Sequence, residues 1–225
     1  MKHFISCHFE PDDLQKHIFA TYFNLRIGIA VIAIIFPVIL SIGGYIQGIS
    51  LQSSMSAYYH EELQNGESMR DWFVGILFAI GVFLNLYRGF TQQENNALNL
   101  AGIFAIGIAI FPEGTGITVH AICAILFFLC IGYVCIWRAS DTLYLLKNDS
   151  QERMYRITYK VIGVFMITFP LLAFLFSLLI QQTHLKVFFI EAFGVWVFAY
   201  YWLMKSRELS YTHAERRALN SEIKI

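Results

Sequence analysis

Long uncharged stretches limit what this sequence can fold into more than any other feature. Residues 27–46 and 118–137 contain no Asp, Glu, Lys or Arg. A helix needs about 20 mostly apolar residues to cross the hydrocarbon core of a bilayer, and both stretches meet this requirement. Over the whole chain 57% of the residues are hydrophobic and 14% are charged, whereas soluble domains carry about 25% charged residues. We therefore expect an all-α, polytopic integral membrane protein.

Six apolar segments predict a six-helix transmembrane bundle that forms a single membrane domain, residues 1–225. A short cytoplasmic N-terminal segment precedes the first span, and it is expected to be either an amphipathic surface helix or a partly ordered tail. The charged C-terminal tail, 205–225, is expected to continue the last helix beyond the membrane. The expected spans are about 25–46, 71–87, 97–111, 118–137, 157–180 and 187–204.

Small residues indicate where the helices should pack closely. Gly75 and Ala79 form a small-xxx-small pair in the second span. Ala101, Ala105 and Ala109 recur every four residues in the third span. Small side chains let helix backbones approach one another in a membrane. We therefore expect the third helix to be central and both stretches to lie at helix contacts.

Lys and Arg residues set the expected orientation, because cytoplasmic segments of membrane proteins are enriched in both. If both termini are inside, all 16 Lys and Arg residues except Arg70 and Lys186 lie on the cytoplasmic side. The sequence therefore predicts an N-in, C-in topology, with the loop 47–70 facing away from the cytoplasm. The formal net charge is zero, so nothing attracts nucleic acid and none is expected as a partner.

The loop between the first two spans is rich in hydroxyl, phenol and guanidinium groups that can bind a ligand. Ser68 and Asp71 have the spacing of a helix-capping signal at the start of the second span, with Ser68 as the N-cap. The candidate ligand-binding residues are Ser54, Ser56, Tyr58, Tyr59 and Arg70.

Asp71, His120 and Glu191 are the candidates for acid–base or hydrogen-bonding roles at the same membrane face, where Glu113 also lies. Glu191 is the most informative, because a carboxylate inside a span is costly and usually faces the bundle interior or water. We expect it to point into the bundle near the outer ends of the second and fourth spans. The alternative is a structural role, either in an ion pair with Arg70 or as a neutral acid bonded to a Ser or Tyr.

No metal or cofactor is expected. The HxxxH and HExxH spacings that would give His120 metal-binding partners do not occur in the sequence. The cysteines of the fourth span are most simply small apolar side chains. Ser56, His60 and Asp71 have an S-x3-H…D spacing, but a short motif by itself does not establish a nucleophilic triad.

Several segments together resemble a known group of proteins. The segments are SMSAYYH, MRDWFVGILFAIGVFLNLYRGF, AGIFAIGIAIFP, HAICAILFF, RMYRITYKVIGV and IEAFGVWVFAYYWLMK. They resemble uncharacterised bacterial six-helix membrane proteins whose loop reads SISxYYY with RDxFVG after it, although His60 stands here for the third tyrosine. The chain is more distantly similar to Frag1/DRAM and DUF998-type proteins, which are linked to lipid remodelling and membrane trafficking. The resemblance implies a multi-pass protein of the bacterial cytoplasmic (inner) membrane and supports the candidate positions named above, but it implies no particular reaction.

Three functions fit these residues, and whether the protein is an enzyme stays open at this point. The leading hypothesis is an outward-facing polar pocket that binds or modifies a lipid or small amphiphile, with Ser, Tyr and Arg70 holding its head group. The second is a small-solute or proton-coupled transporter that uses Glu191, although the sequence has no obvious inverted repeat. The third is a membrane scaffold or assembly factor. Membrane lipid is the expected partner. A groove open to lipid would favour the first function, an axial water path the second, and a filled core the third.

Overall fold

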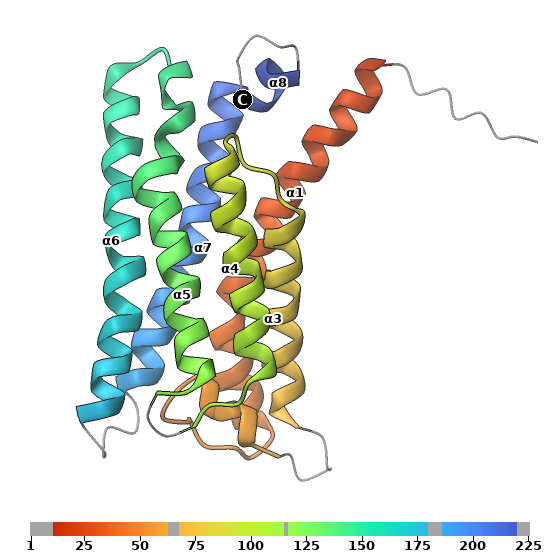
Figure 1. Cartoon of the computed structure of the whole chain (residues 1–225). Coiled ribbons are helices and arrows are strands. Elements are labelled where there is room, and N and C mark those ends of the chain that lie inside the picture. Colours follow the sequence, from red (N-terminus) through yellow and green to blue (C-terminus); the bar gives the residue numbers. More distant parts are fainter. Residues whose placement is uncertain (1–10, 63–67, 115–116, 180–185, 220–225) are drawn as a thin grey trace, which may run out of the picture.

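The computed structural model describes residues 11–62, 68–114, 117–179 and 186–219, and in these residues the protein is a bundle of long helices (Figure 1). The loops gather at two ends, which we name the loop end, holding residues 47–62, and the α8 end opposite it. The elements are α1 (Pro11–Val38), a π-helical turn (Ile39–Gly43), α2 (Gly44–Ile46), a 3-10 helix (Ser56–His60), α3 (Met69–Leu86), α4 (Gln92–Ile110), α5 (Val119–Tyr133), a π-helical turn (Val134–Arg138), a 3-10 helix (Ala139–Leu145), α6 (Asp149–Leu179), α7 (Lys186–Thr212) and α8 (Ala214–Leu219).

Five helical stretches in the described part of the chain are long and apolar enough to cross a membrane. Many large apolar side chains on their outer surfaces, Ile34 and Leu86 among them, are exposed, as a lipid-facing surface requires. α4 packs against both α3 and α5 but is not among the five, because the polar residues 92–96 begin it. The architecture is therefore that of an all-helical membrane bundle, as predicted. The five stretches are Asp13–Ile46, Met69–Leu86, Val119–Leu145, Asp149–Phe176 and Val187–Thr212.

The two ends of the chain extend their helices beyond the expected spans. α1 begins at Pro11 and continues without a break into the first span. Pro37 cannot donate a hydrogen bond to the preceding turn, and the helix becomes π-helical at Ile39. At the other end α7 runs to Thr212, which confirms that the last helix continues into the charged segment.

Helix packing confirms one expectation about small residues and corrects another. Ala101, Ala105 and Ala109 are all buried, so this face of α4 lies at helix contacts, as predicted. Leu100 and Ile103 on its other face are exposed, so α4 lies between α3 and α5 and is not the central helix that was expected. The expected close contact at Gly75 is wrong, because Gly75 is exposed and no atom lies within 4 Å of a Cβ placed on it. The close approach of α3 to α4 lies at Gly81 and Gly102 instead, where a Cβ on Gly102 would lie 2.6 Å from the Gly81 carbonyl oxygen.

Candidate functional site

The loop after α2 folds back onto the helices at the loop end. Tyr58 is fully buried there, and a Cβ on Gly44 would lie 2.9 Å from the Tyr58 ring. The backbone N–H of Phe188, in α7, donates to the Ser53 carbonyl oxygen at 2.9 Å. Burial raises the pKa of the Tyr58 phenol, so this side chain stays neutral. The loop is thus fixed against the helices that carry the other candidate residues.

Three consecutive loop residues are each held by a partner from a different part of the bundle. Two of the partners are carboxylates and the third is an imidazole. The three bonds are Ser54 Oγ to Glu113 Oε2 (2.8 Å), Met55 N to Glu191 Oε2 (2.6 Å) and Ser56 Oγ to His120 Nε2 (2.9 Å). The two carboxylates therefore orient the loop so that the Ser56 side chain lies against the His120 imidazole.

The surroundings of His120 determine which of its ring nitrogens carries the proton. Its Nδ1 lies 2.8 Å from the Phe111 carbonyl oxygen and 3.1 Å from that of Ile108. Carbonyl oxygens only accept hydrogen bonds, so Nδ1 is protonated and donates. Nε2 of the neutral ring is then an acceptor, and the Ser56 hydroxyl donates to it. The two carbonyls belong to the C-terminal end of α4, where backbone oxygens lack helical partners.

Two small cavities meet at Ser56, His120 and Glu191. The first has a volume of about 100 Å³, lies among α5, α6 and α7, and is also lined by Glu113. The second has a volume of about 80 Å³ and is lined mainly by apolar side chains of α1, α3, α5 and α7, including Phe198. Their described lining residues include two carboxylates and no Lys or Arg. The arrangement presents hydroxyl, imidazole and carboxylate groups between a partly polar space and an apolar one.

Glu191 faces the bundle interior, as predicted, but its contacts differ from those expected. It lines both cavities together with His120. Its hydrogen bond is with the backbone of Met55, whereas Arg70 lies over the Tyr59 ring, with 5.7 Å between the guanidinium carbon and the ring centroid. The interior position of Glu191 follows from its helix face, while its partner is decided by the way the loop folds.

Two charged residues in the first turn of α3 do not line the two cavities. Ser68 caps the helix, as predicted, and accepts a hydrogen bond from Arg70 N at 3.2 Å. Asp71 is exposed in the first turn, and neither Arg70 nor Asp71 lines a cavity. The predicted residues that the structure brings together are Ser54, Ser56, His120 and Glu191, and Glu113 joins them.

The S-x3-H…D spacing does not correspond to a triad in space. Ser56 is bonded to His120 in α5, not to His60 of its own 3-10 helix. His60 Nε2 lies 3.0 Å from the Glu113 carbonyl oxygen instead. No group of three or more His, Cys, Asp or Glu side chains that could hold a metal ion occurs in the described residues.

Comparison with known proteins found no relative of this chain. A scan against protein-family models, a search of curated proteins and a search of solved structures each found no match. The resemblance of the loop and helix motifs to a bacterial six-helix family stays a prediction.

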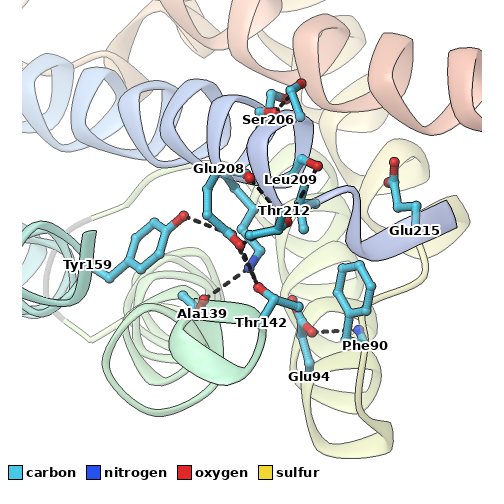
Figure 2. Close-up of polar contacts among 12 residues, drawn as sticks. Phe90, Glu94, Ala139, Thr142, Tyr159, Ser206, Glu208, Leu209, Thr212 and Glu215 are labelled. Carbon is cyan, nitrogen blue, oxygen red and sulfur yellow. Dashed lines mark hydrogen bonds and ion pairs between the residues drawn. The ribbon is translucent and has the colours of Figure 1, made fainter. Parts of the chain in front are cut away.

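A second group of buried polar side chains lies at the α8 end (Figure 2). Lys205 Nζ donates to Glu208 Oε2 at 2.7 Å, to the Ala139 carbonyl oxygen at 2.9 Å and to Thr142 Oγ1 at 2.9 Å. Glu208 also accepts from Thr142 at 2.8 Å and from Tyr159 at 3.2 Å. All three N–H groups of the ammonium and both carboxylate oxygens thus have partners, as a buried ion pair requires. This network, which we name the Lys205 network, joins α6 and α7 to the 3-10 helix Ala139–Leu145.

Sequence reasoning did not identify the Lys205 network, because residues from 205 onward were assigned to a charged tail. Lys205 and Glu208 are 1% and 0% exposed, and Thr212 is also buried. Their spacing of three and four residues puts them on one helix face, which is the signal that could have identified them. Arg26 of α1 adds to this end of the bundle, where it donates to Ser206 at 3.1 Å and forms an ion pair with Glu215.

Proposed function

We propose that this chain is an integral membrane protein whose pocket at the loop end binds a lipid or small amphiphile. The observation that carries the proposal is the meeting of Ser56, His120 and Glu191 between two cavities of different polarity. A ligand's polar group would bond to the hydroxyl, imidazole and carboxylate, and its apolar part would occupy the second cavity. Toward the α8 end, Phe198 and Trp202 are buried and in contact, with their ring centroids 6.3 Å apart. This contact argues against the axial water path of a transporter, and the two cavities at the loop end favour a binding pocket over the filled core of a scaffold.

The proposal includes six membrane spans in the bacterial cytoplasmic membrane, with both termini in the cytoplasm. α4 serves as the sixth span because it packs between α3 and α5 and buries an alanine face. The excess of Lys and Arg at the α8 end supports a cytoplasmic location for that end. The pocket then opens at the outer face, within reach of outer-leaflet lipid.

Reporter fusions test this topology. A reporter domain fused after Lys224 should be active only as a cytoplasmic domain, and one inserted within 61–67 should be active only as an exported domain, because positive segments stay inside. A reporter that is silent at both positions would indicate that the fusion protein is cleaved or misfolded. The amount of each fusion protein is therefore measured by immunoblot. Cytoplasmic activity at 61–67 would contradict the orientation.

Photocrosslinking tests the pocket. The full chain in lipid nanodiscs is irradiated with a diazirine-bearing monoacyl lipid whose acyl chain is short enough for the second cavity, and the labelled peptides are quantified by mass spectrometry. A hydrogen bond between uncharged groups contributes about 0.5–1.5 kcal/mol, so Glu191→Gln should lower labelling of the α5 and α7 peptides by about two- to tenfold. The variant should still fold, since Gln can accept the hydrogen bond from Met55.

Asp71→Asn is the matched control for this experiment. It makes the same chemical change at the same end of the bundle, but Asp71 is exposed and lines neither cavity. Its labelling should equal that of the wild type. Equal labelling of wild type and Glu191→Gln, or labelling confined to outward-facing apolar side chains, would show that the pocket is not the binding site.

A further inference from the structure

We propose that Ser56 is a nucleophile, activated by His120, and that the pocket hydrolyses a short-chain carboxylic ester. This inference rests on the proposed function, because the ester is the amphiphile that the pocket holds. It goes further by naming a bond that is broken and the atoms that act on it.

The first argument is the geometry of Ser56 and His120. The hydroxyl oxygen lies 2.9 Å from Nε2, and the protonated Nδ1 leaves Nε2 free to accept the hydroxyl proton. A serine hydroxyl is a weak nucleophile until a general base stands within hydrogen-bonding distance. Both residues are largely buried, at 8% and 5% exposed, yet both line both cavities. The pair is therefore shielded from bulk water and accessible to a molecule in the pocket.

The second argument is the environment of the opposite ring nitrogen. Nδ1 of His120 donates to carbonyls of Ile108 and Phe111, which lie at the C-terminal end of α4. These carbonyls orient the ring and fix its tautomer, a task that an acidic residue performs in a Ser–His–Asp triad.

The reaction balances with water as the co-reactant. Ser56 Oγ attacks the ester carbonyl carbon while His120 Nε2 takes the hydroxyl proton. The bond from that carbon to the alcohol oxygen breaks, and His120 returns the proton to the departing oxygen, which leaves an acyl-serine. A water molecule then attacks the acyl carbon and gives a proton to His120, and His120 returns that proton to Ser56 Oγ as the bond between the acyl carbon and Oγ breaks. The products are a carboxylic acid, an alcohol and the original serine.

The cavities determine the class of ester. The apolar cavity of about 80 Å³ is smaller than a cavity of about 150 Å³ that binds a benzene molecule, so it accepts only a short acyl group. Glu113 and Glu191 line the neighbouring cavity, and no Lys or Arg is among the described lining residues. No lysine or arginine is therefore among the described lining residues to pair with the charge of an anionic phosphodiester, whereas a carboxylic ester carries no charge at the bond that breaks.

Covalent labelling of the purified full chain in detergent tests the nucleophile. A fluorophosphonate probe should attach to Ser56 of the wild type, as located by mass spectrometry, and 4-nitrophenyl butyrate should be hydrolysed. Ser56→Ala should abolish both reactions. His120→Gln should slow both by about 100-fold or more, the usual contribution of a general base. Ser210→Ala is the matched control, since Ser210 is exposed at the α8 end, and it should react as the wild type does.

Folding controls keep the result interpretable. Thermal unfolding and gel filtration accompany each variant, because Ser56→Ala leaves the buried Nε2 of His120 without a donor. Ser56→Cys keeps a hydrogen-bonding group and should be alkylated by iodoacetamide more slowly when His120 is also replaced by Gln.

Each outcome separates the two proposals. Absence of probe at Ser56 of folded wild type, or equal labelling in His120→Gln, overturns the nucleophile. If lipid photocrosslinking of the pocket is intact in that case, the binding function stands without the reaction. If the folded wild type shows neither lipid photocrosslinking nor fluorophosphonate labelling, both proposals are contradicted. Labelling without lipid photocrosslinking supports the nucleophile and contradicts the lipid as its ligand.

Discussion

Lys205→Met should destabilise the protein by about 3–5 kcal/mol, because it leaves a buried carboxylate without its charged partner. Glu208 is 0% exposed and lies 2.7 Å from Lys205 Nζ. Met fills a volume similar to that of the Lys side chain, so the loss reports charge and hydrogen bonding more than packing. The free energy of unfolding is measured by titration with a denaturing detergent in mixed micelles.

The double variant Lys205→Met/Glu208→Leu should be more stable than the sum of the two single changes predicts. Removing both members of a buried pair leaves no unpaired charge, and replacing such a pair with apolar residues is often close to neutral. The exposed pair of Arg156 and Glu152 on α6 is the control, since Arg156→Met should change stability by less than about 1 kcal/mol. Additive effects of Lys205→Met and Glu208→Leu would show that the two charges do not stabilise each other.

Gly102→Ala should destabilise the protein by about 1–3 kcal/mol, because its methyl group overpacks the contact between α3 and α4. The added Cβ would lie 2.2 Å from Asn85 Nδ2 and 2.6 Å from the Gly81 carbonyl oxygen. The Asn85 side chain can rotate away, but the Gly81 oxygen belongs to the backbone and moves only if the two helices separate. The same detergent titration measures the effect.

Gly75→Ala is the matched control, because Gly75 lies in α3, the helix that packs against Gly102 of α4. Nothing lies within 4 Å of a Cβ at Gly75, so the added methyl meets no clash. Replacing Gly by Ala inside a helix typically stabilises it by about 0.5–1 kcal/mol. If Gly102→Ala proved as stable as Gly75→Ala, α3 and α4 would not be in close contact at this point.

Features that depend on local sequence were predicted well. Apolar length predicted a helical membrane bundle, and the alanine repeat predicted the buried face of α4, because hydrophobicity and helical period are properties of one segment. The N-cap at Ser68 and the continuation of α7 beyond Met204 were also predicted, since caps and helix-forming runs act over a few residues. Glu191 was expected to face inward, because a carboxylate facing lipid is unfavourable wherever its partners lie.

Partners far apart in the sequence were decided only by the tertiary structure. Ser56 pairs with His120, 64 residues away, and Met55 with Glu191, 136 residues away, although His60 lies only one helical turn from Ser56. The sequence likewise assigned the contact face of α3 to Gly75 rather than Gly81, and treated Lys205 as part of a charged tail. The physical reason is common to all three. Sequence patterns determine that a helix forms and how long it is, whereas the rotation of each helix about its axis, and the fold of the loop across it, determine which side chains meet.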